Sequence, residues 1–280
     1  MSPFEQRLQQ VTELISLPEI YLKIRRLMED PTSEIDDFAE VIRIDPSLSV
    51  AVLKLVNSAF FGFAGQIDSI SRAVNMIGIG QLHSMVLSIS SISALNFPND
   101  IWPLKTFWRS SLFTGVLSRL LAEQLNLNVK QSGRLFVIGL LHEIGHLVLY
   151  AKFPEQAHQT IQAAQHDDLP AHLAEQQVLG CHYGQIGAML MEQWGLSTEF
   201  QQITRNQPTP GEASDLPVET AILHIAHGHA HHQFSDGDKS VDDLTDPAVW
   251  KIIQLSPQQV EETLDAARTI SADMESVLLR

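Results

Sequence analysis

Residues 36–55 read DDFAEVIRIDPSLSVAVLKL, and this stretch indicates the fold class. Its apolar side chains recur at steps of three and four residues, which is the period of an amphipathic α-helix. Pro46 interrupts the pattern, but proline fits the first turn of a new helix, where its missing N–H removes no bond. Asp45, directly before it, is a suitable N-cap. The stretch therefore predicts two consecutive helices.

The same helical period runs along most of the chain. Strands are not expected, because no stretch alternates cleanly and no Asn-Gly or Asp-Gly turn joins two alternating stretches. The predicted fold class is all-α. Helices are expected at about residues 5–14, 18–29, 34–44, 69–78, 80–96, 104–126, 131–150, 154–167, 170–180, 183–194, 197–206, 217–232 and 257–278.

Composition excludes several classes of protein. The 280 residues are 44% hydrophobic and 18% charged, which rules out a disordered or collagen-like chain. The net charge of -15 argues against nucleic acid and anionic membrane surfaces as partners. Cys181 is the only cysteine, so no intrachain disulfide can form and a reducing cytoplasm is the expected location. Neither a signal peptide nor an uninterrupted apolar span is present, so no membrane association is expected.

Residues 142–146 read HEIGH, which matches the H-E-x-x-H pattern of zinc proteases. The motif lies within a strongly apolar helical pattern, and His142 and His146 are four residues apart, so both are expected on one helix face. The third metal ligand of such enzymes is missing, since Leu149 and Lys152 stand where the extended pattern needs Gly and His. The protease interpretation is therefore disfavoured.

Several ordered blocks resemble the HDOD domain, the HD-related output domain of bacterial signalling proteins. They are LPEI (17–20), IDPSL (44–48), VNSAFF (56–61), SISRAV (69–74), IGIGQL (77–82) and LGCHYGQIG (179–187). Two more, FWRSS (107–111) and GLLHEIG (139–145), resemble the wider HD superfamily of metal-dependent phosphohydrolases. The resemblance covers roughly residues 14–232. It implies an N-terminal helical subdomain over residues 1–100 and an HD-like subdomain with a C-terminal helical extension over residues 101–280.

The resemblance also implies a site, but this chain departs from the catalytic pattern. HD enzymes use a first His, a His-Asp pair and a late Asp to hold divalent metals that polarise phosphate. Here Ser110 stands at the first His, and Glu143 replaces the Asp that should follow His142. His227 stands at the position of the late Asp.

Binuclear HD relatives add further histidines, and these are only partly present. His182 matches one of them, whereas Gln207-Pro208 replaces an adjacent His pair. The resemblance thus implies a degenerate metal site, with no cofactor expected and a divalent ion (manganese, iron, zinc or magnesium) as the alternative. The candidate ligands are His142, Glu143, His182 and His227, and the surrounding pocket residues are Arg109, Ser110 and His146.

The function implied by the resemblance is that of a bacterial signal-transduction output module. Such a module would bind a signalling protein or a small ligand and would not catalyse a reaction. The alternative is a metal-dependent phosphohydrolase acting on a nucleotide or phosphate ester. The replacements at Ser110 and His227 count against that alternative.

Further histidines and the cysteine have simpler interpretations. His224, His227 and His231 share one helix face, and with two more histidines nearby they favour a solvated helix end over a metal or pH-sensing site. Cys181 lies beside His182, but adjacent helical residues point about 100° apart. A structural thiol is therefore favoured over a nucleophile.

Overall fold

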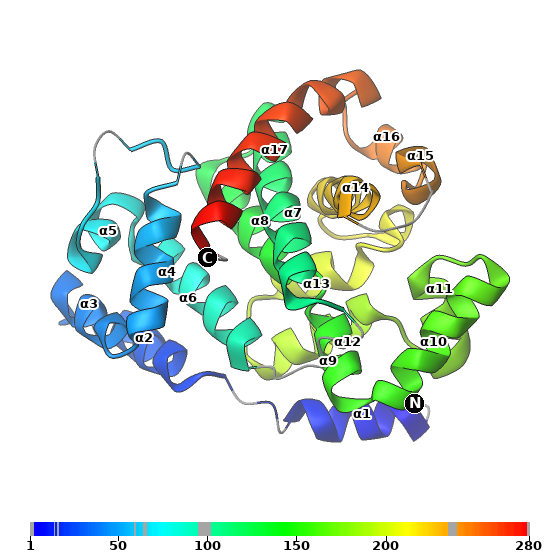
Figure 1. The fold of residues 1–280 in the computed structure, drawn as a ribbon, viewed down its shortest axis with the longest axis horizontal. Coiled ribbons are helices and arrows are strands. Elements are labelled where there is room, and N and C mark those ends of the chain that lie inside the picture. Colours follow the sequence, from blue (N-terminus) through cyan, green and yellow to red (C-terminus); the bar gives the residue numbers. More distant parts are fainter. Residues whose placement is uncertain are drawn as a thin grey trace. The chain divides into compact units, whose positions relative to one another are not determined.

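The computed structural model describes residues 3–13, 15, 17–58, 60–63, 66–94, 102–234 and 240–278, and the described part is helical without strands (Figure 1). The all-α prediction is confirmed. The contacts group the chain into a large unit, Met1–Ser16 with Leu95–Asp265, and a small unit, Leu17–Ala94 with Ala266–Arg280. This grouping is interleaved along the sequence, whereas the predicted division is into two continuous segments, 1–100 and 101–280. That division stays a prediction.

The small unit contains the two helices that the opening stretch predicts. Asp45 caps the second of them, because its carboxylate accepts hydrogen bonds from the backbone N–H groups of Ser47 (2.9 Å) and Leu48 (3.1 Å). Phe38, Ile42 and other apolar residues of the pattern are buried. The helices of this unit are α2 (Glu19–Glu29), α3 (Ile35–Arg43), α4 (Pro46–Val56), α5 (Ile70–Ile77), α6 (Ile79–Ala94) and the end of α17 (Pro257–Leu278).

Asn57 fastens the loop that follows α4. Its side-chain amide donates to the Ile67 carbonyl at 2.7 Å, and its carbonyl oxygen accepts from the Ile67 N–H at 2.7 Å. The loop between them carries Phe60, Phe61 and Phe63, whose rings contact one another in sequence. Phe60 is buried. The side-chain amide of Asn57 therefore holds the two ends of the loop together through a pair of hydrogen bonds to the backbone of Ile67.

The large unit positions the candidate site. Its helices are α1 (Pro3–Glu13), α7 (Leu104–Gln124), α8 (Val129–Leu141), α9 (Ile144–Lys152), α10 (Pro154–Asp167), α11 (Ala171–Leu179), α12 (Tyr183–Gln193), α13 (Thr198–Asn206), η1 (Pro210–Glu212), α14 (Pro217–Phe234), α15 (Val241–Leu244), α16 (Val249–Ile252) and the start of α17. Helix α7 packs against both α8 and α14, and α12 packs against α9 and α13 (Figure 1). The short elements η1, α15 and α16 were not predicted, since each is about one turn long.

Glycine lets α7 and α8 approach closely. A Cβ atom on Gly139 would lie 2.5 Å from the Cα of Gly115, and one on Gly115 would lie 2.8 Å from the Phe136 carbonyl oxygen. Real Cβ atoms cannot sit so near to backbone, so both positions need glycine for this packing. The contact fixes the last turn of α8, from which the candidate site begins.

One stretch, Val129–Lys152, is long and apolar enough to cross a membrane by composition alone. It comprises α8 and α9, and 83% of its most apolar window is buried inside the protein. Core helices of globular proteins pass the same test. The burial accounts for the apolar composition here.

Candidate metal centre

The HEIGH motif lies at a break between two helices. Helix α8 ends at Leu141 and α9 begins at Ile144, so the continuous helix predicted over residues 131–150 is wrong. The His146 N–H bonds to the Glu143 carbonyl at 3.0 Å, three residues back. This frees the His142 carbonyl, which accepts a hydrogen bond from the Gln207 side-chain amide at 2.7 Å. The break turns the two histidines of the motif in different directions.

Gly145 explains why α9 takes this course. A Cβ atom at this position would lie 1.9 Å from the Tyr183 carbonyl oxygen and 2.8 Å from the Gly187 nitrogen. Helix α9 therefore rests directly on the backbone of α12, at a distance that only glycine permits. The contact brings the side chains of α9 against the first turn of α12.

His142 is completely buried and has a defined tautomer. Its Nδ1 lies 2.7 Å from the Gly139 carbonyl oxygen, which can only accept, so Nδ1 carries the proton. Burial lowers the pKa of His142, so the ring is neutral. The unprotonated Nε2 lies 3.0 Å from Nδ1 of His227 on α14. Burial also lowers the pKa of His227, so two neutral imidazoles face each other.

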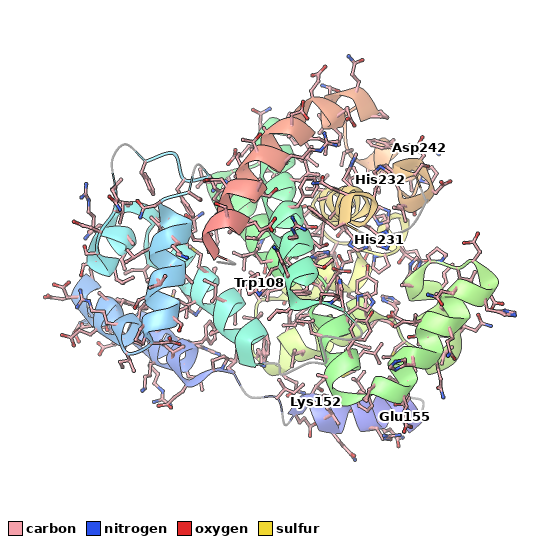
Figure 2. All side chains as sticks on the ribbon, in the orientation of Figure 1. Trp108, Lys152, Glu155, His231, His232 and Asp242 are labelled. Atoms are coloured by element: carbon pink, nitrogen blue, oxygen red, sulfur yellow. The ribbon has the colours of Figure 1, made fainter. Side chains whose placement is uncertain are left out.

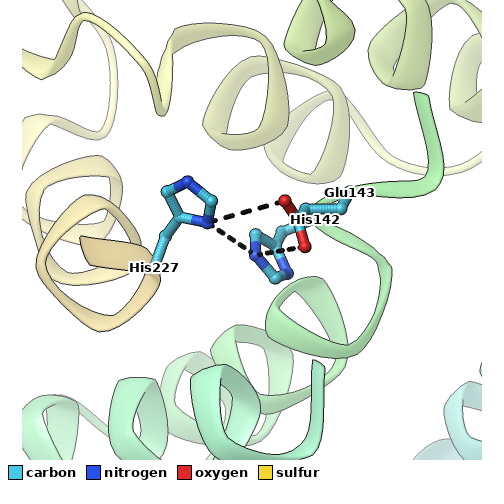
Figure 3. Close-up of side chains that lie close together, drawn as sticks. All are labelled: His142, Glu143 and His227. Carbon is cyan, nitrogen blue, oxygen red and sulfur yellow. Dashed lines mark hydrogen bonds and ion pairs between the residues drawn. The ribbon is translucent and has the colours of Figure 1, made fainter. Parts of the chain in front are cut away.

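Glu143 completes the group of facing side chains (Figure 3). Its Oε2 lies 3.7 Å from His142 Nε2 and its Oε1 lies 3.9 Å from His227 Nδ1. Burial raises the pKa of Glu143. Its interactions with His142, His146 and His227 outweigh burial and lower the pKa to about 2. Oε2 has no hydrogen-bond partner among the described residues. A buried carboxylate with an unpaired oxygen is costly unless a cation or donor meets it.

This donor set fits a divalent metal ion. One ligand atom each from His142, Glu143 and His227 lies within 4.8 Å of the others. Ligands bound at about 2.0–2.2 Å from one ion lie roughly 3–4 Å apart, which is the range measured here. Two imidazoles with one carboxylate are a known set for zinc and for iron(II). The neutral nitrogens and the unpaired Glu143 oxygen therefore have the chemistry that such an ion requires.

His146 plays a different part from the one that the zinc-protease pattern predicts. Its Nε2 lies 2.8 Å from Glu175 Oε1, and its Nδ1 lies 3.5 Å from Glu143 Oε1. Burial would lower the pKa of His146, but Glu175 and Glu143 outweigh burial and raise it to about 10. The ring is an imidazolium between two carboxylates, so it offers no lone pair to a metal.

Of the other predicted site residues, His182 is outside the group of three facing side chains. His182 is buried at the start of α12 and its ring is 6.3 Å from that of His172, and it is not part of the three-residue group. Its Nδ1 is buried with no hydrogen-bond partner among the described residues. Ser110 is buried on α7, whereas Arg109 is exposed. The ligand role of His182 and the pocket roles of Arg109 and Ser110 stay predictions.

The histidines of α14 divide into different environments. His224 is buried, with Nδ1 donating to the Gln207 carbonyl at 2.6 Å and Nε2 accepting from the Asp246 N–H at 2.9 Å. It is a structural residue. His231 and His232 are exposed at the end of the helix (Figure 2). The His227 and His231 rings lie 6.1 Å apart, so the same helix face runs from the cluster to solvent.

Two residues that contact His146 were not among the predicted site residues. Glu175 is buried on α11 and accepts a hydrogen bond from the Tyr183 N–H at 2.7 Å, in addition to its contact with His146. The Tyr183 ring stacks on His146 with centroids 4.2 Å apart. The available signal was the acidic residue within the apolar stripe of α11, between Ala174 and Leu179, where a lone glutamate needs a buried partner.

Comparison with known proteins identifies the family. A family model described as the HDOD domain matches residues 14–210. A candidate phosphohydrolase from Shewanella amazonensis SB2B has a structure with a TM-score of 0.76 and 25% sequence identity, over 97% of each chain. An HDOD domain protein with unknown function from Geobacter sulfurreducens has a TM-score of 0.72 and 20% identity, over 95% of this chain and 93% of its own.

A curated relative also matches nearly the whole chain. An uncharacterized protein of Treponema pallidum (strain Nichols) is 25% identical over 269 residues, which is 95% of this chain and 50% of that protein. The chain thus spans half the length of this relative. Because the family model covers more than half of the residues and the fold matches over nearly the full length, this chain belongs to the HDOD domain family.

Proposed function

We propose that this chain is a regulatory output module of bacterial signalling that acts by binding rather than by turnover, and that its HD-derived site holds one divalent metal ion. The observation that carries the metal site is the convergence of two neutral imidazole nitrogens on a buried carboxylate oxygen without a hydrogen-bond partner. His142 and Glu143 would hold the ion from the α8–α9 break, and His227 would hold it from α14. The ion would tie these segments together.

Replacements elsewhere in the catalytic pattern argue against hydrolysis. The first His of the catalytic pattern is replaced by Ser110, whose hydroxyl is a poor metal ligand beside imidazole. The adjacent His pair of binuclear relatives is replaced by Gln207-Pro208, and the Gln207 amide is engaged by the His142 carbonyl. A two-metal site that clamps both the attacking and the leaving oxygen therefore lacks its second set of ligands.

The net charge of the buried side chains favours the binding of a cation. Two buried carboxylates, Glu143 and Glu175, surround one imidazolium, His146, while His142 and His227 are neutral. The buried group is net negative, which favours a metal ion over a free phosphate or other anion. An ion held by three protein ligands has open positions for an oxygen or nitrogen of a small ligand.

A metal-dependent phosphohydrolase is the second candidate function. It is favoured by the two-histidine, one-carboxylate donor set, which also occurs in hydrolytic zinc sites. The likeness to the Shewanella candidate phosphohydrolase, at 25% identity, points the same way. Under this alternative the substrate would be a nucleotide or another phosphate ester.

Metal content and turnover separate the two functions. Tag-free protein would be purified without added metal and analysed by mass spectrometry, beside His142→Ala and the surface control His232→Ala. We expect about one ion per chain in wild type and control, and none in His142→Ala. We expect no hydrolysis of nucleotides or p-nitrophenyl phosphate. Hydrolysis that disappears in His142→Ala would establish the alternative, and absence of metal from wild type would contradict the metal site.

The partner of the module is a separate part of the proposal. We expect a signalling protein or a small ligand, and no nucleic acid or membrane, because the net charge of -15 repels phosphate. Thermal unfolding with a panel of nucleotides and metabolites, with and without Zn²⁺, would detect the ligand. A pull-down with His142→Ala as the matched control would detect a partner that reads the site. Binding that is equal for both proteins would contradict a role of the site in recognition.

A further inference from the structure

We propose that Glu175 is a positioning residue for the metal site, which acts through His146 to orient the carboxylate of Glu143. This role rests on the metal binding proposed above. It concerns residues beyond the three candidate ligands and explains how a glutamate works where the catalytic pattern has an aspartate.

Glu175 is held at both oxygens. Oε1 lies 2.8 Å from His146 Nε2, and Oε2 accepts a hydrogen bond from the Tyr183 N–H at 2.7 Å. The side chain is 3% exposed, so water does not compete for either oxygen. Since Tyr183 begins α12, the carboxylate is fixed to the first turn of a neighbouring helix and cannot rotate without breaking one contact.

Aromatic rings fix the plane of His146. Tyr183 stacks on it at a centroid distance of 4.2 Å and an interplanar angle of 19°. Tyr150 stacks at 5.5 Å and 14°, and Trp102 meets it edge-on at 6.0 Å and 82°. With its plane fixed by these rings and its Nε2 fixed by Glu175, the ring has only one direction left for Nδ1. That direction is toward Glu143.

The fixed ring of His146 gives the two Glu143 oxygens different environments. Nδ1 of His146 lies 3.5 Å from Oε1, a close contact that is not a hydrogen bond. Oε2 is buried without a hydrogen-bond partner among the described residues, and it lies 3.7 Å from His142 Nε2. The additional methylene of glutamate relative to aspartate gives the carboxylate more rotational freedom, and the contact with His146 limits that freedom. Glu175 therefore sets which oxygen faces the metal.

The test is the affinity for Co²⁺, whose visible absorption reports ligand geometry. Wild type would be compared with Glu175→Gln, His146→Gln and the double variant. Glu219→Gln is the matched control, because Glu219 is a buried glutamate of the same unit that accepts a hydrogen bond from Gln131 instead. Thermal unfolding of each metal-free protein measures the purely structural cost.

We expect Glu175→Gln to weaken Co²⁺ binding by about 10- to 100-fold, as is usual for residues that orient a metal ligand. Its Co²⁺ absorption bands should shift as well, while Glu219→Gln keeps the affinity and spectrum of wild type at a similar loss of thermal stability. The double variant should bind no more weakly than His146→Gln, because Glu175 acts through that ring.

Three results would overturn the proposal. One is wild-type affinity and spectrum in Glu175→Gln; a second is an equal loss of affinity in Glu219→Gln, which would make the effect one of stability. The third is a double variant whose loss of Co²⁺ binding free energy equals the sum of the losses in the two single variants. Wild-type protein that binds no Co²⁺ would overturn the proposed metal site itself, which distinguishes that failure from a failure of Glu175 alone.

Discussion

The Nε2 atom of His142 lies 3.0 Å from the Nδ1 atom of His227, although the two residues are 85 positions apart in the sequence. His142 stands at the break between α8 and α9, and His227 stands in the middle of α14. The contact therefore joins two distant segments through a pair of neutral imidazoles. A nitrogen at position 227, where the catalytic pattern has an oxygen, changes the metal that this site should prefer.

We predict that His227→Asp shifts the metal preference from zinc toward manganese and magnesium. Carboxylate oxygens suit these harder ions, whereas imidazole suits zinc and iron. The variant should lose zinc relative to manganese by at least about tenfold in competition binding followed by mass spectrometry. His232→Asp, at an exposed position of the same helix, is the control and should leave the preference unchanged. An unaltered zinc preference in His227→Asp would show that His227 is not a ligand.

We predict that Gly145→Ala strongly destabilises the protein. The added Cβ would lie 1.9 Å from the Tyr183 carbonyl oxygen, which is backbone and cannot rotate away. Separating α9 from α12 should cost about 3 kcal/mol or more. Urea unfolding followed by circular dichroism measures the loss.

Gly80→Ala is the matched control, since a Cβ there meets nothing within 4 Å. Its helical position should make alanine neutral or stabilising by up to about 1 kcal/mol. Equal stability of the two variants would contradict the close contact of α9 and α12.

We predict that His83 makes the small unit sensitive to mild acid. The ring stacks on Tyr21 at 4.5 Å, and its Nε2 is buried without a hydrogen-bond partner among the described residues. Burial, with a smaller effect from Arg25, lowers its pKa from 6.5 to about 4. The unfolded chain binds the proton more readily than the folded chain. The contribution of neutral His83 to the free energy of unfolding is therefore fully present above pH 6.5 and is lost as the pH falls toward 4.

Urea midpoints measured between neutral pH and pH 4 test this sensitivity. His83→Gln should flatten the decline between pH 6.5 and 4, because glutamine does not titrate. His158→Gln, at an exposed histidine, should decline like wild type. An identical pH dependence in all three proteins would show that His83 titrates normally in the folded state.

We predict that Cys181 is unreactive in the folded protein. Cys181 is 4% exposed, and burial, with the nearby Glu5 and Glu175, raises the pKa of its thiol to about 12. Since the thiolate is the reactive species, labelling with Ellman's reagent should be at least about 100-fold slower in native protein than in urea. Rapid labelling of the native protein would instead reopen a nucleophilic role beside His182.

The fold was predictable because its signals are local. The period of apolar residues around Phe38 and Ile42, the Asp45 cap and Pro46 at the first turn each act within a few residues, and the helices form as these patterns require. The HEIGH motif could not be predicted from local signals alone. Its helical pattern is continuous, yet the helix is interrupted there because Gly145 packs directly on the Tyr183 backbone and the Gln207 amide donates a hydrogen bond to the His142 carbonyl.

The sequence by itself determined an all-helical chain, the family resemblance and a set of four candidate ligands, His142, Glu143, His182 and His227. Only the tertiary structure decided that three of these meet, that His182 lies outside their cluster, and that His146 is an imidazolium held by Glu175. Helix formation depends on neighbours three or four residues away, which a pattern records. Coordination and charge depend on atoms brought together within a few ångströms by packing, which no local pattern records.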